Sequence, residues 1–281
     1  MDISIIVITF NSAHCIEQCV ADAQNALNSA NLKGEIIVFE NGSSDGTTEK
    51  LKSLETQYDN LKVIYSPHNT GTTTSRNAAM KESTGDFILV LDSDAFLTTE
   101  CITGLRQFLI NNPEYGLVGP MLTYASGNFQ LSYDDFPTAQ RKFERFLFLK
   151  SIEKRPIPGA AAMEVDYLIS ACWLFTREVY EKVGPLDEQI FYAPEDVDYC
   201  IRVWKAGFKI GYVPEYKMVH DAQELSRGFV LNRFKFLHLQ GLAYYFRKHS
   251  YMFSLKKVRQ RIEEAVVARA KQTELAKSKQ S

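Results

Sequence analysis

The stretch DFILVLDSDA (86–95) decides the fold class of this 281-residue chain. Its apolar centre is short and ends abruptly at Asp92, which is typical of a strand buried on both faces of a parallel sheet. Ser93 and Asp94 follow where the chain leaves that strand. Ligands of such sheets bind beyond the carboxyl ends of the strands. We therefore expect a functional site at this edge of the sheet.

Upstream of this stretch, three more apolar runs alternate with segments of helical pattern. The strand-like runs are ISIIVITF (3–10), EIIVFE (35–40) and LKVIYS (61–66). We expect helices that end near Ala30, Tyr58 and Glu82, the first of them capped by Asn11 and Ser12. This repetition predicts right-handed βαβ units, and hence an α/β fold whose mostly parallel central sheet is flanked by helices.

Downstream of about residue 115 the pattern is less regular. VDYLISACWLFT (165–176) has the composition of one strand, and helical segments on either side of an acidic loop follow it. The chain from 228 to 281 has helical patterns, first aromatic and then basic. We expect this last part to be a separate helical extension.

The composition and charge exclude several classes of protein. The net charge is −2, yet residues 227–281 hold 13 basic and 3 acidic residues, which leaves an acidic body. An acidic body repels a nucleic acid backbone, so we expect no nucleic acid partner. No apolar run approaches the roughly 20 residues that span a bilayer, and we expect no signal peptide. Five scattered cysteines favour free thiols in a reducing, cytoplasmic compartment.

Asp92 and Asp94 are candidate metal ligands. Divalent cations such as Mn²⁺ or Mg²⁺ prefer oxygen ligands and keep open positions for phosphate, so a cation held here could neutralise a diphosphate. His220 is a candidate further ligand, because imidazole suits Mn²⁺-like ions. The alternatives are a strand-end turn with capping aspartates and a histidine of the core or surface.

Two further acidic segments could serve a ligand. In ENGSSDGT (40–47), Glu40 and Asp45 could accept hydrogen bonds from a nucleobase or a ribose, although a loop with a helix cap explains them equally well. In YAPEDVD (192–198), a carboxylate could act as a general base. The alternative is an acidic first helical turn. We assign Asp198 to this helical turn, because it stands four residues before Arg202 and can form an ion pair with it.

Taken together, these segments resemble the inverting family 2 glycosyltransferases of GT-A fold. The matching segments are SIIVITFNS (4–12), EIIVFENGSSDGT (35–47), NTGTTTSRNAAMKESTGDFILVLDSDA (69–95) and VDYLISACWLFTREVYEKVGPLDEQIFYAPEDVDYCIRVWKAGFKIGYVPEYKMVH (165–220). The last segment is similar to the bacterial rhamnosyltransferase-like branch. The resemblance covers about residues 3–250 and implies a catalytic domain over 1–225. That domain would comprise a nucleotide-binding half (about 1–120) and an acceptor-side half (about 121–225), followed by the extension (226–281).

The resemblance also implies a role for each candidate residue. The nucleotide-binding residues would be Thr9, Glu40, Asp45, Arg76, Asp92 and Ser93, with Arg76 near the diphosphate. The metal ligands would be Asp92, Asp94 and His220. Asp196 would be the catalytic base, with Glu195 the next candidate. Two positions depart from the family pattern, since Glu40 stands where Asp is usual, and Ser170 with Ala171 where Gly-Ala is frequent.

The activity implied by the resemblance is transfer of a sugar from a nucleotide diphosphate to an acceptor hydroxyl, with inversion and with a divalent metal. The donor would be dTDP-rhamnose or a UDP-hexose. The acceptor would be a saccharide linked to a polyprenyl diphosphate, in bacterial surface polysaccharide synthesis. Two alternatives stay open: a nucleotidyltransferase, and a non-catalytic nucleotide-sugar-binding protein of the same fold. The first normally has a Gly-rich basic phosphate loop, which ITFNSAHC (8–15) does not resemble.

The basic, aromatic extension is expected to contact an anionic membrane. Its apolar stripe has helical spacing, with most of the nearby basic residues off the stripe, as in interfacial helices. The stripe consists of Leu255, Val258, Ile262 and Val266. The aromatic residues of the extension are Phe229, Phe234, Phe236, Tyr244, Tyr245, Phe246, Tyr251 and Phe253. This predicts a cytoplasmic protein peripheral to the inner face of the cytoplasmic membrane. The alternative is packing of the extension on the catalytic domain or on a second subunit in a homodimer.

Overall fold

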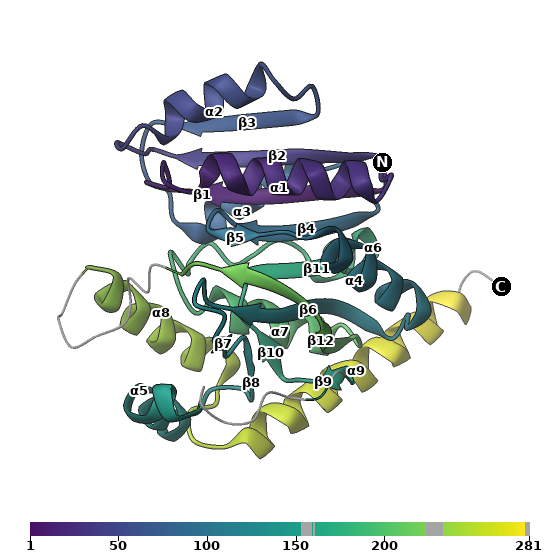
Figure 1. The fold of residues 1–281 in the computed structure, drawn as a ribbon. Helices are drawn as coiled ribbons and strands as arrows, with labels where there is room; N and C mark the ends of the chain where they lie inside the picture. The colour runs from purple at the N-terminus through teal and green to yellow at the C-terminus, as the bar shows by residue number, and fades with distance from the viewer. Residues whose placement is uncertain (153–158, 160, 223–232, 279–281) are drawn as a thin grey trace.

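The computed structural model describes residues 1–152, 159, 161–222 and 233–278 (Figure 1). Its central sheet begins with four parallel strands in the order β3-β2-β1-β4. These strands are β1 (Ile3–Thr9), β2 (Gly34–Asn41), β3 (Leu61–Ser66) and β4 (Phe87–Asp92). Their bounds lie within two residues of the sequence-based ones, because each is a continuous apolar run that ends in polar residues.

The other half of the sheet is mixed. β11 (Cys172–Thr176) runs antiparallel to both of its neighbours, β4 and β6 (Tyr115–Thr123), and β12 (Lys209–His220) runs parallel to β6. Short strands β5 (Ala95–Phe96), β7 (Phe129–Gln130) and β9 (Met163–Glu164) complete this sheet. A separate pair joins β8 (Tyr133–Asp134) to β10 (Tyr167–Leu168).

The single strand predicted over 165–176 is wrong, because the structure divides it into β10 and β11. The residues between them are used by other parts of the chain. Ile169 donates its backbone N–H to the carbonyl oxygen of Ser132, and the carbonyl oxygen of Ala171 accepts from the N–H of Asp92. The carbonyl oxygen of Ser170 accepts from the guanidinium of Arg76. Local composition could not reveal these tertiary hydrogen bonds.

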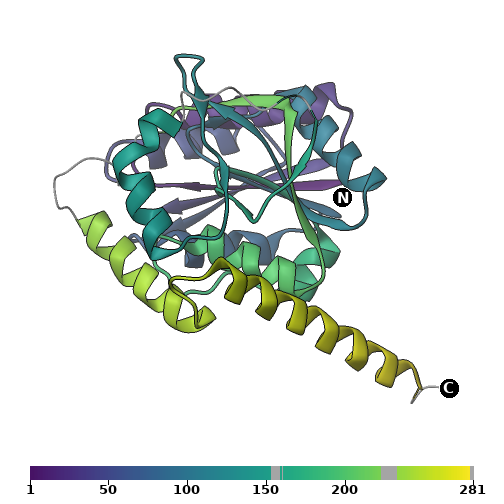
Figure 2. The same cartoon turned by 90° about the horizontal axis from the view of Figure 1, so that it is seen from below.

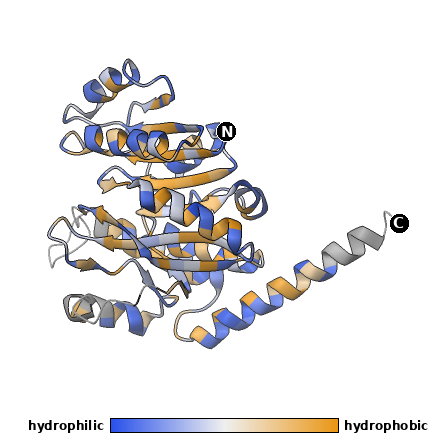
Figure 3. Cartoon of the chain, turned by 45° about the vertical axis from the view of Figure 1, so that its right-hand side comes forward, coloured by the Kyte–Doolittle hydropathy of each residue, from blue (hydrophilic) through white to orange (hydrophobic). Residues whose placement is uncertain are grey.

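Helices cover both faces of the sheet (Figure 1). Successive strand residues point to opposite faces, so Ile5 and Ile6 belong to two different apolar clusters. On the face of Ile5 lie α1 (Ile16–Ser29), α2 (Thr47–Glu55) and α4 (Thr99–Asn111). On the face of Ile6 lie α3 (Thr72–Glu82), α6 (Arg177–Val183) and α7 (Glu195–Lys205). Figure 3 shows the central strands as largely hydrophobic, between helices of mixed character.

The C-terminal helices pack on the same face as α7. α8 (Arg233–His249) and α9 (Leu255–Ser278) contribute Tyr245, Val258 and Ile262 to the cluster that contains Ile6. The apolar stripe of α9 therefore faces the domain along the first half of the helix. This is packing of the extension on the catalytic domain, which was the alternative to membrane contact. Beyond that half, α9 extends away from the sheet (Figure 2). Phe229 and the side chains of Arg233, Phe234 and Lys235 lie outside the described residues.

α5 (Ala139–Ile152) lies between β8 and β9 in the chain. Two further observations bear on the sequence-based expectations. Within the described ranges, none of the helices has both the length and the apolar composition needed to cross a bilayer. All five cysteines are free and buried, as expected for thiols that form no disulfide framework.

Candidate active site

A cleft of about 400 Å³ lies beyond the carboxyl ends of β1 and β4. These strands are parallel neighbours, so their ends meet at one edge of the sheet. The first turn of α7 and the end of β12 complete the cleft. Among its lining residues are Thr9, Arg76, Asp92, Ser93, Asp94, Glu195, Asp196 and His220. Most of the residues singled out by the sequence therefore meet in one place.

Three of these residues form a candidate metal centre. The ligand atoms of Asp92, Asp94 and His220 all lie within 4.8 Å of one another. Nε2 of His220 is 3.3 Å from Oδ1 of Asp94 and 3.9 Å from Oδ2 of Asp92. β12 brings the histidine there because it pairs with β5, where His220 stands opposite Ala95. Two carboxylates and one imidazole form a donor set that fits Mn²⁺ or Mg²⁺.

Gln130 orients the imidazole of His220. Nδ1–H of His220 donates to Oε1 of Gln130 at 2.8 Å, which leaves Nε2 as the nitrogen nearest the two aspartates. A hydrogen bond of this kind on the remote nitrogen is the usual support of a metal-ligating histidine. Nothing in the sequence around Gln130 pointed to this role, since β7 is a two-residue strand far from the matched motifs.

Arg76 joins the candidate metal centre to the first turn of α7. It is 1% exposed, and its Nη2 donates to Oδ1 of Asp92 at 2.7 Å. Its Nη1 donates to Oε1 of Glu195 at 2.9 Å. One buried cation thus pairs with two carboxylates from different elements. Without this cation the buried carboxylate of Glu195 would lack a charged partner, which is strongly destabilising.

The two acids of the α7 turn have different surroundings. Glu195 is 6% exposed, and its carboxylate also accepts from the hydroxyl of Ser170 at 2.9 Å. The pKa of Glu195 is raised to about 7, first by burial and then by the charge of Asp196, while Arg76 and Ser170 oppose the change. Asp196 lines the cleft, and its Oδ1 accepts from the N–H of Val197 at 2.8 Å.

The loop after β1 is tied to two neighbouring loops. The predicted cap of α1 is wrong, since α1 begins at Ile16 and has no side-chain cap. Oδ1 of Asn11 instead accepts from the N–H of Ser44 at 2.9 Å, and the hydroxyls of Ser12 and Ser93 are 2.8 Å apart. The local pattern assigned Asn11 and Ser12 to the cap of α1. In the structure, these side chains instead form hydrogen bonds with residues in the loops after β2 and β4.

Thr9 offers an unsatisfied hydroxyl to the cleft. Its Oγ1 is buried and, among the described residues, has no hydrogen-bond partner. A buried hydroxyl without a partner costs folding free energy. This position is therefore suited to hydrogen bonding with a ligand.

Glu40 and Asp45 are not among the described residues that line the cleft. The carboxylate of Glu40 accepts from the backbone N–H of Ser43 at 2.6 Å. Asp45 accepts from the N–H groups of Ala13 at 3.0 Å and Thr47 at 3.1 Å. Both carboxylates stabilise loop backbone in this structure, so a nucleotide contact by either residue stays a prediction.

Several lining residues had no individual role predicted from the sequence. They include Asn41, Asn69, Thr72, Gln130, Ser170 and Tyr192. Asn41 fixes the loop after β3, because its Oδ1 accepts from the N–H of Thr70 at 2.7 Å and its Nδ2 donates to Asn69 at 3.2 Å. Asn41 directly follows Glu40 at the end of a predicted strand, and this position was the sequence signal that could have identified it as a cleft residue.

The sheet order and this cleft at its carboxyl edge define a domain of GT-A type. The family model described as "Glycosyl transferase family 2" matches residues 4–184. The chain belongs to this family, as the sequence motifs indicated.

Curated relatives and solved structures agree with this assignment. Glycosyltransferase AglE of Haloferax volcanii is 26% identical over 225 residues, which cover 79% of this chain and 67% of AglE. N-acetylglucosaminyl-diphospho-decaprenol L-rhamnosyltransferase of Mycobacterium tuberculosis is 26% identical over 66% of each chain. The structure of GalNAc-T7 with UDP, GalNAc and Mn²⁺ superposes with a TM-score of 0.64 at 13% identity. It covers 88% of this chain and 48% of GalNAc-T7, and it supports the fold alone.

Proposed function

We propose that the protein is a metal-dependent, inverting glycosyltransferase that uses a nucleotide-diphosphate sugar. The observation that carries the proposal is the single cleft in which the Asp92–Asp94–His220 centre and the Glu195–Asp196 turn meet, joined through Arg76. The chain spans about two thirds of the length of its curated relatives, so the activity of the whole protein is part of the proposal.

The proposed reaction is a direct displacement at the anomeric carbon. The acceptor hydroxyl attacks this carbon, its proton passes to the carboxylate of Asp196, and the bond to the diphosphate oxygen breaks. We assign the base to Asp196 because the carboxylate of Glu195 is engaged by Arg76 and Ser170. A divalent cation bound by Asp92, Asp94 and His220 would supply charge stabilisation for the departing diphosphate.

The other residues of the cleft bind and orient the donor in this proposal. The orphan hydroxyl of Thr9 suits a polar group of the nucleoside. Arg76 acts on the diphosphate end indirectly, by holding Asp92 in place. The proposed donor is dTDP-rhamnose or a UDP-hexose, and the L-rhamnosyltransferase among the relatives supports a rhamnosyl donor.

A donor screen with the full chain tests this function. Nucleotide sugars are incubated with Mn²⁺ or Mg²⁺, with and without EDTA, and release of the nucleoside diphosphate and configuration of the product are recorded. We expect release of the nucleoside diphosphate, which EDTA should abolish, and a product of inverted configuration. In a parallel incubation with a nucleoside triphosphate and a sugar 1-phosphate, pyrophosphate release would favour a nucleotidyltransferase. Binding without turnover on any acceptor would favour a non-catalytic protein.

We further propose a lipid-linked acceptor, reached at the inner face of the cytoplasmic membrane. The decaprenyl-linked substrate in the name of the relative supports it. Large exposed apolar side chains also occur on α5, on α8 and on the turn between α8 and α9. They are Phe143, Leu147, Phe148, Phe236, Leu239, Met252 and Phe253. We call this set the apolar surface.

The elements of the apolar surface are neighbours. Figures 1 and 2 place α5 beside α8, and the N–H of Ala139 donates to the carbonyl oxygen of Met252 at 2.9 Å. Basic residues flank the turn at Arg247, Lys256 and Lys257. Near an anionic leaflet each contributes about 1 kcal/mol. This surface replaces the buried stripe of α9 as the candidate membrane contact.

Vesicle sedimentation distinguishes membrane contact from mere exposure. The Met252→Ser/Phe253→Ser variant should pellet less with anionic vesicles than the unsubstituted chain does. Val267→Ser is the matched control, since Val267 is an exposed apolar residue of α9 outside the apolar surface. Equal sedimentation of both variants, or equal binding to neutral vesicles, would overturn this part of the proposal.

A further inference from the structure

The loop that delivers the α7 turn to the cleft is held on one side by α3. We call residues 184–194 the base loop. The N–H of Thr72 donates to the carbonyl oxygen of Phe191 at 2.7 Å. Asn77 pairs with the backbone of Leu186, accepting from its N–H at 2.8 Å and donating to its carbonyl oxygen at 2.9 Å. The nucleotide-side half of the domain therefore fixes one flank of the loop.

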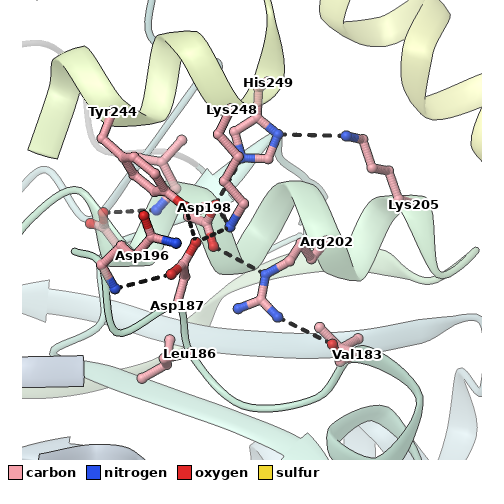
Figure 4. Close-up of polar contacts among 12 residues, drawn as sticks. Val183, Leu186, Asp187, Asp196, Asp198, Arg202, Lys205, Tyr244, Lys248 and His249 are labelled. Carbon is pink, nitrogen blue, oxygen red and sulfur yellow. Dashed lines mark hydrogen bonds and ion pairs between the residues drawn. The ribbon is translucent and has the colours of Figure 1, made fainter. Parts of the chain in front are cut away.

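α8 holds the other flank (Figure 4). The hydroxyl of Tyr244 donates to Asp187 of the base loop at 2.7 Å. Nζ of Lys248 lies 2.6 Å from Asp187 and 2.6 Å from Asp198 of α7. A single ammonium group of the C-terminal extension thus connects the loop to the helix that follows it.

Asp198 is the centre of this network. Its side chain is 1% exposed and meets Lys248, Nε2 of His249 at 2.8 Å and Nε of Arg202 at 3.0 Å. Although burial works in the opposite direction, the hydrogen bond from His249 and the charges of Arg202 and Lys248 hold the pKa of Asp198 well below its ordinary value. The pairing with Arg202 confirms the sequence-based interpretation. Asp198 also has two partners on α8, Lys248 and His249, which the sequence did not predict. Their contact lies two residues from Asp196.

Gly241 brings the backbone of α8 against the end of the base loop. A Cβ atom at this position would overlap the carbonyl oxygen of Ala193 and would lie 3.3 Å from Cδ of Pro194. Glycine within a helix costs about 1 kcal/mol relative to alanine. Here its absent side chain permits an approach that reaches the residues just before Glu195.

We infer that α8 is a positioning element of the active site, which holds the base loop and thereby sets where Asp196 stands in the cleft. The inference rests on the proposed function for its catalytic meaning. It assigns the C-terminal extension a role beyond stability, because its contacts converge on the segment 187–198 rather than on the sheet alone.

The first test is Gly241→Ala in the full chain. The added methyl group must displace either α8 or the Ala193 carbonyl, while the helix itself gains propensity. A displacement of about 1 Å at a catalytic group lowers turnover about 10²-fold. We expect that loss in kcat with unchanged affinity for the nucleotide in Mn²⁺, and a lower Tm because the atom that the methyl group meets is a backbone oxygen.

The second test compares two cations of the C-terminal extension. Lys248→Ala removes the contact with Asp187 and Asp198, whereas Lys271→Ala removes an equal charge from a solvent-exposed position on α9. We expect kcat to fall about tenfold in the first variant and to stay within about twofold in the second, by the same positional argument. Lys248→Arg keeps a cation within reach and should restore most of the loss.

Hydrogen exchange tests whether α8 holds the base loop, independently of whether the protein transfers a sugar. Exchange of amides in 187–198 should be faster in Lys248→Ala than in Lys271→Ala, whether or not a sugar donor has been found. If the unsubstituted chain transfers no sugar, the proposed function fails while this readout still tests the contact. Unchanged kcat in Gly241→Ala, or equal exchange in the two cation variants, would overturn the positioning role.

Discussion

The acids after β4 and the acids at the start of α7 are similar in sequence and differ in their partners. Asp92 and Asp94 are 30% and 19% exposed, and each faces the imidazole of His220. The side chains of Glu195 and Asp198 are 7% and 1% exposed, and both pair with cations of the protein. Although Arg76 also pairs with Asp92, the first pair is more exposed and leaves room for a ligand's charge. In the second segment, buried ion pairs fix the backbone from which Asp196 reaches the cleft.

Removing a charge from the first pair should have the largest effect. In Asp94→Asn we expect transfer to fall at least about 10³-fold, because several kcal/mol of charge stabilisation depend on the metal. Tm should change little, since Asp94 lacks the Arg76 partner that Asp92 has. Asp59→Asn, on the surface, is the control. Undiminished activity in both Asp92→Asn and Asp94→Asn would refute the metal assignment.

Asp196→Asn tests the second segment at its cleft-facing residue. Turnover should fall about 10²–10⁴-fold, because a general base acts in the transition state. The affinity for the nucleotide in Mn²⁺, measured by calorimetry, should persist. A collapse of that affinity would instead make Asp196 a binding residue and Glu195 the better base.

His220→Ala probes how far the first site depends on its imidazole. We expect Gln130→Ala, which removes only the orienting hydrogen bond, to lower the affinity for Mn²⁺ about 10–100-fold, and His220→Ala, which removes the ligand itself, to lower it further. Metal titrations and melts without metal provide the comparison. A severe drop of Tm together with an unchanged titration would identify His220 as a structural histidine.

The smallest effect concerns the pH dependence of stability. The pKa of Glu195 is raised from 4.5 to about 7, so its contribution to folding is complete below 4.5 and is lost as pH rises through 7. Glu195→Gln cannot ionise. Its Tm should therefore depend less on pH between 4.5 and 7 than that of the unsubstituted chain. Parallel curves for the two proteins would contradict the raised pKa.

Much of the fold could be predicted because its elements are locally encoded. The apolar runs of β1 to β4 end in polar residues, and this pattern alone predicts that Asp92, Ser93 and Asp94 lie at the ligand edge of the sheet. The strand over 165–176 failed because Ser170 and Ala171 bond to other elements. Composition carries no information about such tertiary partners.

The candidate site was predictable in part for the same reason. Motif residues such as His220 and Arg76 meet at the cleft, but the pattern gave no sign that Arg76 bridges two carboxylates. Gln130 and Lys248 lie outside every quoted motif, and their roles depend on contacts across long sequence separations. The boundary at 225 stays a prediction, although residues beyond it share the core of the domain.

The five buried thiols have a practical consequence for spectroscopy. The thiolate is the reactive form of cysteine, and burial raises the pKa of Cys15 to about 12 and those of Cys19 and Cys200 well above the ordinary value. A maleimide dye should therefore react with a cysteine introduced at the surface far faster than with the natural ones. Phe253→Cys would carry an environment-sensitive fluorophore at the α8–α9 turn. Its emission would report solvent polarity as vesicles are added, without a cysteine-free background.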